Sequence, residues 1–270
     1  MAKRPTKKKV TKAKSNLPAN WKQQASAKAK QVAERVPVGV GNNLQLHRSG
    51  EFRFQGASLG QELDVVIVDF VFANKYYSTD YDEDNITPPS CFALGVNEDT
   101  MAPDASSPEQ QNPACEDCWA NQFKSAGKGK ACGNKRRLAL LHSDSLDGEM
   151  LMLELPPTTI KAFDLYVSKI TGTVHLPTSC VLTRLSFDDQ ADHQKLEFAF
   201  VEALPDKIAG ACFMRTYEAE KALLTPYNTS GYEKPKDAKP RGHAATRKKT
   251  SARPARSTRK KATKKRSKMS

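Results

Sequence analysis

The sequence predicts a mainly β domain with a minor α content, flanked by two basic tails that we expect to be disordered. Three observations predict this fold class. Short segments rich in β-branched and aromatic residues alternate with turn residues along the middle of the chain. Only two stretches in that middle part, residues 158–172 and about 206–224, are predicted as helices. The first 35 and the last 37 residues hold almost no large apolar side chains, so they cannot offset the entropy of ordering.

The charge of the chain is divided sharply between these parts. Residues 1–35 carry a net charge of +10 and residues 234–270 carry +15, whereas residues 36–233 carry −12. We therefore predict a basic arm at 1–35, an acidic folded domain at 36–233 with an insertion at 90–135, and a basic tail at 234–270. Tails of this kind bind polyanions by neutralising phosphates and releasing counterions. The alternative is a solubilising or targeting role, and the cluster Arg259–Lys268 is typical of a nuclear-localisation signal.

The elements follow one another in a simple order. The strongest strand signal is Leu63–Tyr77, where acids interrupt a β-branched and aromatic run. A helix should begin at an N-cap formed by Thr158 or Thr159 and end at Gly172. Residues 96–135 show no periodicity, and a loop of that length is uncommon unless it is functional or braced. The predicted strands are 52–54, 63–77, 88–95, 136–142, 149–155, 179–187 and 195–202.

A five-stranded oligonucleotide-binding barrel carries its helix between its third and fourth strands. The order here fits that barrel if the pair of strands at 136–155 supplies strand three with an extra partner, and other small α+β folds share the same order. Such barrels bind oligonucleotides across one face and two loops. We therefore expect an oligonucleotide-binding-like barrel with an inserted, braced loop.

Four cysteines predict the brace. Cys115, Cys118 and Cys132 have C-x2-C-x13-C spacing, which lets two thiolates on a tight turn and a third from a later segment face one ion. Cys91 is the favoured fourth ligand of one structural Zn²⁺ per chain, with His142, Asp117 or water as alternatives. The alternative is that these cysteines are reduced thiols in a loop. Cys180 and Cys212 fall in apolar segments and are predicted to be core residues.

Basic and aromatic residues gather around the last of these cysteines. Cations for phosphates and flat rings for bases are what a single strand requires. The alternatives are a solvated loop for the cations and core packing for the rings. The predicted nucleic-acid-binding residues are Lys124, Lys128, Lys130, Lys135, Arg136, Arg137, Trp119, Phe123, Tyr76 and Tyr77.

Several function classes are disfavoured by the sequence. The chain has no apolar run long enough for a membrane span and no signal peptide, so we expect an intracellular protein that is not secreted. The segment Gly127–Lys130 lacks the ending of a phosphate-binding loop. The acids Asp64, Asp69 and Asp80–Asp84 suggest a metal-dependent nuclease only as a minor alternative, and no catalytic base is identifiable.

The motif series also resembles a group of bacteriophage proteins. The resemblance covers about residues 60–205 and depends on Ser90–Gly95, Cys115–Cys118, Gly127–Cys132 and Arg136–Leu141. It implies an oligonucleotide-binding fold, a zinc-bearing insertion, and a non-enzymatic single-stranded DNA-binding role in phage replication and recombination. It further implies a location in the host cytoplasm or nucleoid. The basic C-terminus departs from the acidic tail with which such proteins often recruit replication proteins.

The expected partner is therefore single-stranded DNA, with duplex DNA or RNA contacted through the tails. A second hypothesis is a histone-like packaging or structural protein that binds duplex DNA through its tails. Preference for duplex over single strands distinguishes the two.

Overall fold

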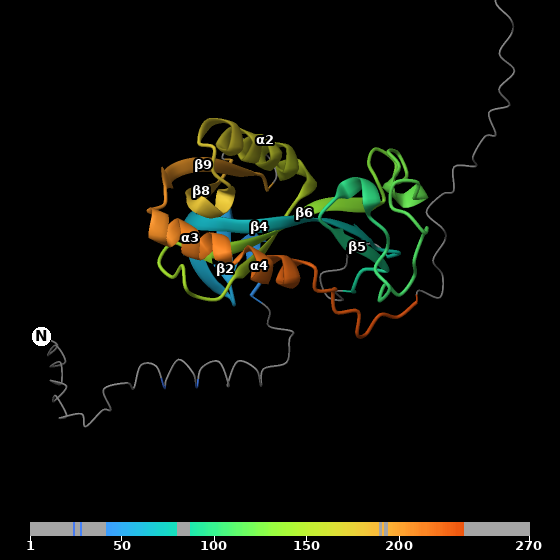
Figure 1. Cartoon of the computed structure of the whole chain (residues 1–270). Coiled ribbons are helices and arrows are strands. Elements are labelled where there is room, and N and C mark those ends of the chain that lie inside the picture. Colours follow the sequence, from blue (N-terminus) through green and yellow to red (C-terminus); the bar gives the residue numbers. More distant parts are fainter. Residues whose placement is uncertain are drawn as a thin grey trace, which may run out of the picture.

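A computed structural model provides the structure of the protein and describes Gln24, Lys28 and residues 42–79, 87–188, 191 and 194–234. Both predicted tails lie outside these residues, apart from Gln24, Lys28 and the first residue of the C-terminal tail. The architecture is mainly β, as predicted, with antiparallel sheets and helices packed on them (Figure 1).

The main sheet is built around β4 (Glu62–Tyr76), the longest strand of the described chain. One edge of β4 pairs with β6 along most of its length, while the other edge pairs first with β8 and then with β5. All of these pairings are antiparallel, and a bulge in β4 between Ile67 and Asp69 shifts the register. The strand order is β7-β6-β4-β8-β9, with β5 beside the last part of β4. The other strands of this sheet are β5 (Cys91–Gly95), β6 (Cys132–His142), β7 (Leu151–Leu155), β8 (Val181–Phe187) and β9 (Leu196–Ala203).

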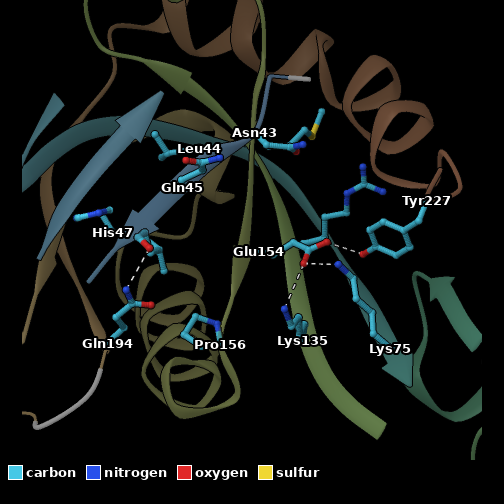
Figure 2. A pocket seen from close by; sticks show the side chains of 13 residues that line it. Asn43, Leu44, Gln45, His47, Lys75, Lys135, Glu154, Pro156, Gln194 and Tyr227 are labelled. Carbon is cyan, nitrogen blue, oxygen red and sulfur yellow. Dashed lines mark hydrogen bonds and ion pairs between the residues drawn. The ribbon is translucent and has the colours of Figure 1, made fainter. Parts of the chain in front are cut away.

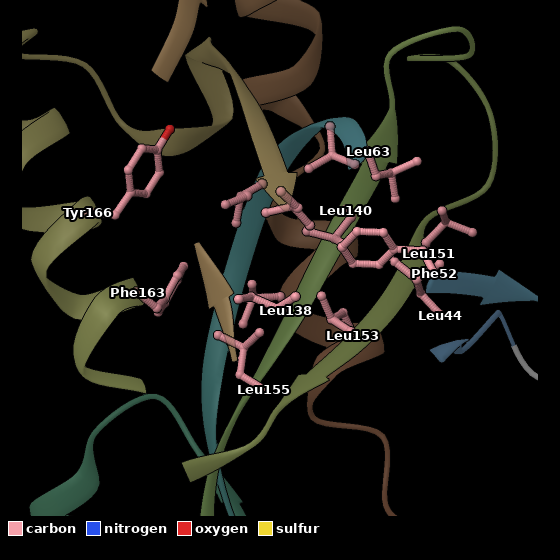
Figure 3. Packing of buried hydrophobic residues seen from close by; sticks show 14 of the residues in the cluster. Leu44, Phe52, Leu63, Leu138, Leu140, Leu151, Leu153, Leu155, Phe163 and Tyr166 are labelled. Carbon is pink, nitrogen blue, oxygen red and sulfur yellow. The ribbon is translucent and has the colours of Figure 1, made fainter. Parts of the chain in front are cut away.

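Helices cover both faces of this sheet, which explains why β4 is apolar on both sides. On one face, Phe163 of α2 (Pro157–Thr173) lies in one buried cluster with leucines of β6 and β7 (Figure 3). Tyr166 of the same helix stacks on the Phe198 ring of β9. On the other face, α3 (Asp206–Met214) and α4 (Thr216–Leu223) cover Val66, Val68 and Val71. The strongest strand signal in the sequence is therefore the centre of a double-sided core.

The boundaries of the helices differ from the prediction in two places. The N-cap of α2 is Pro156, with Pro157 in the first turn, so neither threonine caps it. Thr159 instead accepts a hydrogen bond from the Leu196 N–H, which ties α2 to β9. The single helix expected over 206–224 is divided at Arg215, whose guanidinium donates to the carbonyl oxygens of Leu146 and Gly148.

A second sheet precedes the main one in the chain. Its strands are β1 (Leu44–His47), β2 (Glu51–Phe54) and β3 (Ala57–Gly60), in the order β1-β2-β3. Gln55 and Gly56 both have positive φ angles, 49° and 83°, as a two-residue hairpin turn requires.

The small sheet lies between the two edges of the main sheet, the edge at β7 and the edge at β8 and β9. Next to β1, Asn43 forms a bridge to Met152 of β7. At the opposite end, the Phe52 ring lies 4.8 Å from the Phe187 ring of β8, and Gln194 donates to the Leu46 carbonyl. The expected five-stranded barrel is therefore not closed: in the described part of the chain no ladder joins β7 to β9, and the small sheet occupies the gap.

None of the helices in the described part of the chain combines the length and the apolar character needed to cross a membrane.

Candidate nucleic-acid interface and cysteine cluster

The predicted insertion is a long ordered loop that connects β5 to β6. Part of its backbone hydrogen-bonds to β5 and to the residue before it. The Asp104 N–H donates to the Phe92 carbonyl, and the Glu109 N–H donates to the Ser90 carbonyl. Met101 is buried, and its carbonyl accepts from the Cys115 N–H. The loop contains only two short 3-10 helices, η1 (Glu98–Thr100) and η2 (Trp119–Asn121). Loop segments of this kind need such partners for their polar groups.

The four predicted metal ligands lie in one neighbourhood. Cys91 begins β5 and Cys132 begins β6, and both are cross-strand partners of Tyr76 in β4. Cross-strand partners share one face of a sheet, so the two thiols flank the Tyr76 ring on the same side. Cys115 and Cys118 form a tight turn just before η2, closed by a hydrogen bond from the Cys118 N–H to the Cys115 carbonyl. All four are buried and free of disulfides.

The thiols influence one another electrostatically. Burial raises the pKa of the Cys132 thiol to about 12, and the other three cysteines add to the rise. Burial also raises the pKa of Cys91 and Cys115, although hydrogen bonds from the Gln111 backbone and the Asn74 side chain oppose it. As these side chains stand, no three His, Cys, Asp or Glu residues of the described chain surround one point as metal ligands do.

The alternative ligands lie elsewhere or point outward. His142 is at the far end of β6, ten residues from Cys132, which corresponds to about 33 Å along a strand. Asp117 is exposed in the turn between the two neighbouring cysteines. Cys180 and Cys212 are buried near α3, as predicted for core residues.

Three of the predicted lysines and one ring are exposed on the loop after η2. Ala126 and Gly129 pair across a tight turn in which Gly127 has a φ of 67°, a value that favours glycine. Lys128 lies at the tip of this turn. The Phe123 ring is 69% exposed, so it packs on little of the protein. Lys124 and Lys130 are also exposed, and Lys130 reaches back to donate to Asn121.

The basic run Lys135–Arg137 is divided between the two faces of β6, because successive side chains of a strand alternate. Arg136 is buried beneath α2, with its guanidinium 4.0 Å from the centre of the Phe72 ring. It pairs with Asp164 of α2 at 3.3 Å and with Glu98 of η1 at 3.5 Å. Lys135 and Arg137 point to the opposite face and line a cavity there.

The predicted aromatic residues divide in a similar way. Tyr76 is buried in the cysteine cluster, and its ring contacts Trp119 edge-on at 5.5 Å. Tyr77 follows it on the other face and is 37% exposed. The structure therefore leaves Phe123 and Tyr77 available to stack on a base, while Tyr76 and Trp119 pack within the protein.

The cavity beside Lys135 and Arg137 also contains residues that sequence reasoning missed. Lys75 of β4 places its Nζ 2.6 Å from Oε2 of Glu154 in β7, and Lys135 places its Nζ 3.4 Å from the same oxygen (Figure 2). The Tyr227 hydroxyl donates to Oε1 of Glu154 at 2.6 Å. A faint signal existed, since Lys75 and Glu154 interrupt apolar strands. Tyr227 offered none, because it follows the last helix in an irregular segment.

The charges in this cavity perturb one another. Burial alone raises the pKa of Glu154, but the charges of Lys75 and Lys135 outweigh it, and the pKa falls to about 2. Burial lowers the pKa of Lys75 against the attraction of Glu154. Burial and the nearby Glu154 carboxylate raise the pKa of Tyr227. The carboxylate is therefore ionised at every physiological pH.

Asp64 and Asp69, the two described acids among those considered for a nuclease site, belong to no cluster of three possible metal ligands within the described residues. Asp64 accepts two hydrogen bonds from the Arg184 guanidinium, at 2.7 and 2.8 Å, on the surface of β4 and β8. Asp69 lies on the bulge of β4, where burial raises its pKa and Glu220 adds to the rise. The turn Asp80–Asp84 lies outside the described residues.

No protein-family model, curated protein or solved structure matches this chain. A functional assignment therefore depends on the residues and their geometry.

Proposed function

We propose that this chain is a non-enzymatic single-stranded DNA-binding protein of phage replication or recombination that binds with little sequence specificity. The observation that carries the proposal is the connection of the main sheet. Its long strand β4 pairs with β6 and β8, β7 follows β6, α2 follows β7, and β9 follows β8. This order agrees with that of an oligonucleotide-binding barrel opened between its third and fifth strands, and it supports the proposal.

The position of the exposed loop supports the same proposal. In such barrels the loop between the first two strands and the outer face of the second and third strands bind oligonucleotides. Here the connection from β4 to β6 includes β5, and the loop between β5 and β6 carries Phe123, Lys124, Lys128 and Lys130. The corresponding outer face, which is the face of the main sheet opposite α2, carries Lys135 and Arg137. The loop alone therefore carries an exposed ring together with three cations, the combination that single-strand binding requires.

Fluorescence anisotropy of the full chain tests this proposal. The probes are an oligothymidylate of about 30 nucleotides, longer than a typical site, and a duplex of equal length at the same salt concentration. We expect a preference for the single strand. The double variant Phe123→Ala/Lys128→Ala should weaken single-strand binding at least about fivefold, since base stacking contributes about 1–3 kcal/mol. Leu165→Ala/Lys169→Ala is the matched control, because Leu165 is also 69% exposed but lies on α2.

A preference for duplex that the loop variant leaves unchanged would contradict the proposal. That result would favour the packaging hypothesis, in which the tails make the contact. Repeating the titration at several salt concentrations separates the two contributions. Binding by the lysine-rich tails should decline steeply with salt, whereas stacking on Phe123 should persist.

We propose further that Cys91, Cys115, Cys118 and Cys132 hold one structural Zn²⁺. Two strand ends and one tight turn bring four buried, free thiols into one neighbourhood, and four thiolates are a common structural zinc set. The ion would brace a loop that has little regular structure of its own. Protein purified without chelator should contain about one zinc per chain, and Cys118→Ser should abolish it. Cys180→Ser is the control that should retain the metal, and metal-free wild-type protein would refute the assignment.

A further inference from the structure

A cavity of about 550 Å³ lies between the small sheet and the outer face of the main sheet (Figure 2). One wall is β1, which contributes the polar residues Gln45 and His47. The other wall is formed by Lys75, Lys135 and Arg137, from β4 and β6. This volume is in the range of small-ligand sites and suits one nucleotide unit.

The charged lining of the cavity is unbalanced. Three cations face a single carboxylate, Glu154, so the lining carries a net charge of +2 with His47 neutral. Cationic clefts with low-dielectric walls concentrate the field and attract anions.

The three cations are not held equally. Lys75 is the tightly held partner of Glu154, because its ammonium lies 2.6 Å from the carboxylate, is 10% exposed and sits over the Tyr227 ring. Lys135 lies 3.4 Å away and is 31% exposed. Arg137 donates two hydrogen bonds to the carbonyl oxygens of Leu223 and Thr225, and these uncharged groups do not neutralise its positive charge. Lys135 and Arg137 are therefore less fully neutralised than Lys75 and can attract an anionic ligand.

We propose that this cavity binds one phosphate-bearing unit of a nucleic-acid strand, with the phosphate at Lys135 and Arg137. The inference rests on the proposed function and extends it to a specific subsite. Phosphate contacts of this kind position a strand without reading its sequence. Lys75 and Glu154 are positioning residues: their ion pair fixes the floor of the cavity and holds Tyr227 against it.

A substitution of Glu154 tests the proposal through the direction in which the affinity for phosphate changes. Among the residues that the structure describes, Glu154 is the only carboxylate in the lining of the cavity. Its replacement by glutamine removes the negative charge that competes with a phosphate for Lys135. Glu154→Gln should therefore tighten phosphate binding even though it weakens the fold. A residue with a purely structural role would have the opposite effect or none.

The experiment is calorimetric titration of the full chain with two probes, 5′-phosphorylated thymidine dinucleotide and inorganic pyrophosphate. Lys135→Ala should weaken binding of both probes about tenfold, because a hydrogen bond to a charged group is lost. Glu154→Gln should tighten binding several-fold. Lys161→Ala, an exposed lysine on α2, is the control and should change neither affinity. With the long single strand, Lys135→Ala should also reduce the salt slope by about one.

The outcomes separate this site from the proposed function. If the chain binds the long strand but Lys135→Ala and Glu154→Gln leave every affinity unchanged, the subsite is refuted and the proposed function stands. If pyrophosphate binds and depends on Lys135 while no single strand binds, the cavity takes a free phosphate and the proposed function fails. If Glu154→Gln does not fold, Lys135→Glu replaces it. Lys135 is partly exposed, and charge reversal there should abolish binding of both probes.

Discussion

Lys75 and Glu154 are 79 residues apart in sequence, yet their charged atoms lie 2.6 Å apart across β4, β6 and β7. The pair joins the central strand to the edge strand on the outer face of the main sheet. Its electrostatics predict a specific dependence of stability on pH. The pKa of Glu154 is lowered from 4.5 to about 2 in the folded chain. A group of this kind contributes stability that is present above pH 4.5 and is lost as the pH falls towards 2.

The lowering corresponds to about 3 kcal/mol, at roughly 1.4 kcal/mol for each tenfold change in proton affinity. Denaturant unfolding of wild type and Glu154→Gln at several pH values between 2 and 7 should therefore give stability curves that converge at low pH. The exposed substitution Glu116→Gln is the control and should give a curve parallel to that of the wild type. A constant difference between wild type and Glu154→Gln at all pH values would contradict the role of the ion pair.

Tyr227 secures the segment after α4 to the same carboxylate. Tyr227→Phe keeps the ring, which contacts Phe92 at 5.1 Å, but removes the hydroxyl that donates to Glu154. We expect the free energy of unfolding to fall by about 1–3 kcal/mol, the usual value for a hydrogen bond to a charged group. Tyr217→Phe, at a tyrosine that is 79% exposed, should cost almost nothing. Equal losses in both variants would show that the hydroxyl contributes little.

The fold was predictable where a segment had one clear hydrophobic pattern along its length. The run Leu63–Tyr77 is apolar on both faces because helices cover both, and its strand follows directly. The two helical segments were also found, although the break at Arg215 was not. That break depends on hydrogen bonds from Arg215 to the turn at Leu146 and Gly148, which lies almost 70 residues earlier.

The candidate site was predictable only as a list of residue types. Spacing brought out Cys115, Cys118 and Cys132, and the structure places them together with Cys91. The direction of each side chain in the basic run follows from the alternation of a strand, which sends Lys135 and Arg137 to one face and Arg136 to the other. The cavity itself depends on the small sheet and on Tyr227, which no local pattern connects to Lys75.

Removing the proposed metal should affect the loop more than the core. The four cysteines join the ends of β5 and β6 to the turn before η2, whereas the main core is formed by α2 and the leucines of the sheet. Chelator should therefore lower the melting temperature and expose the loop at Gly127–Lys130 to proteases, while β-sheet circular dichroism persists. Cys132→Ser should reproduce both effects without chelator. Cys212→Ser changes a residue in the core beneath α3 and α4. It should lower the melting temperature but leave the loop protected. Loss of the whole sheet signal on chelation would show that the brace supports the entire domain.

Adjacent basic residues of β6 should have opposite mutational effects. Arg136 lies 4.0 Å from the centre of the Phe72 ring and pairs with Asp164 and Glu98, so Arg136→Met should cost about 1–3 kcal/mol of stability. Its side chain does not line the cavity. Single-strand affinity, measured by anisotropy on the folded fraction, should therefore stay within about twofold of wild type. Lys135→Ala should give the reverse pattern, with little change in stability and a clear loss of affinity. If Arg136→Met instead weakens binding as much as Lys135→Ala, the single-stranded DNA contacts the α2 face of the sheet. The outer face of β6 is then not the binding surface.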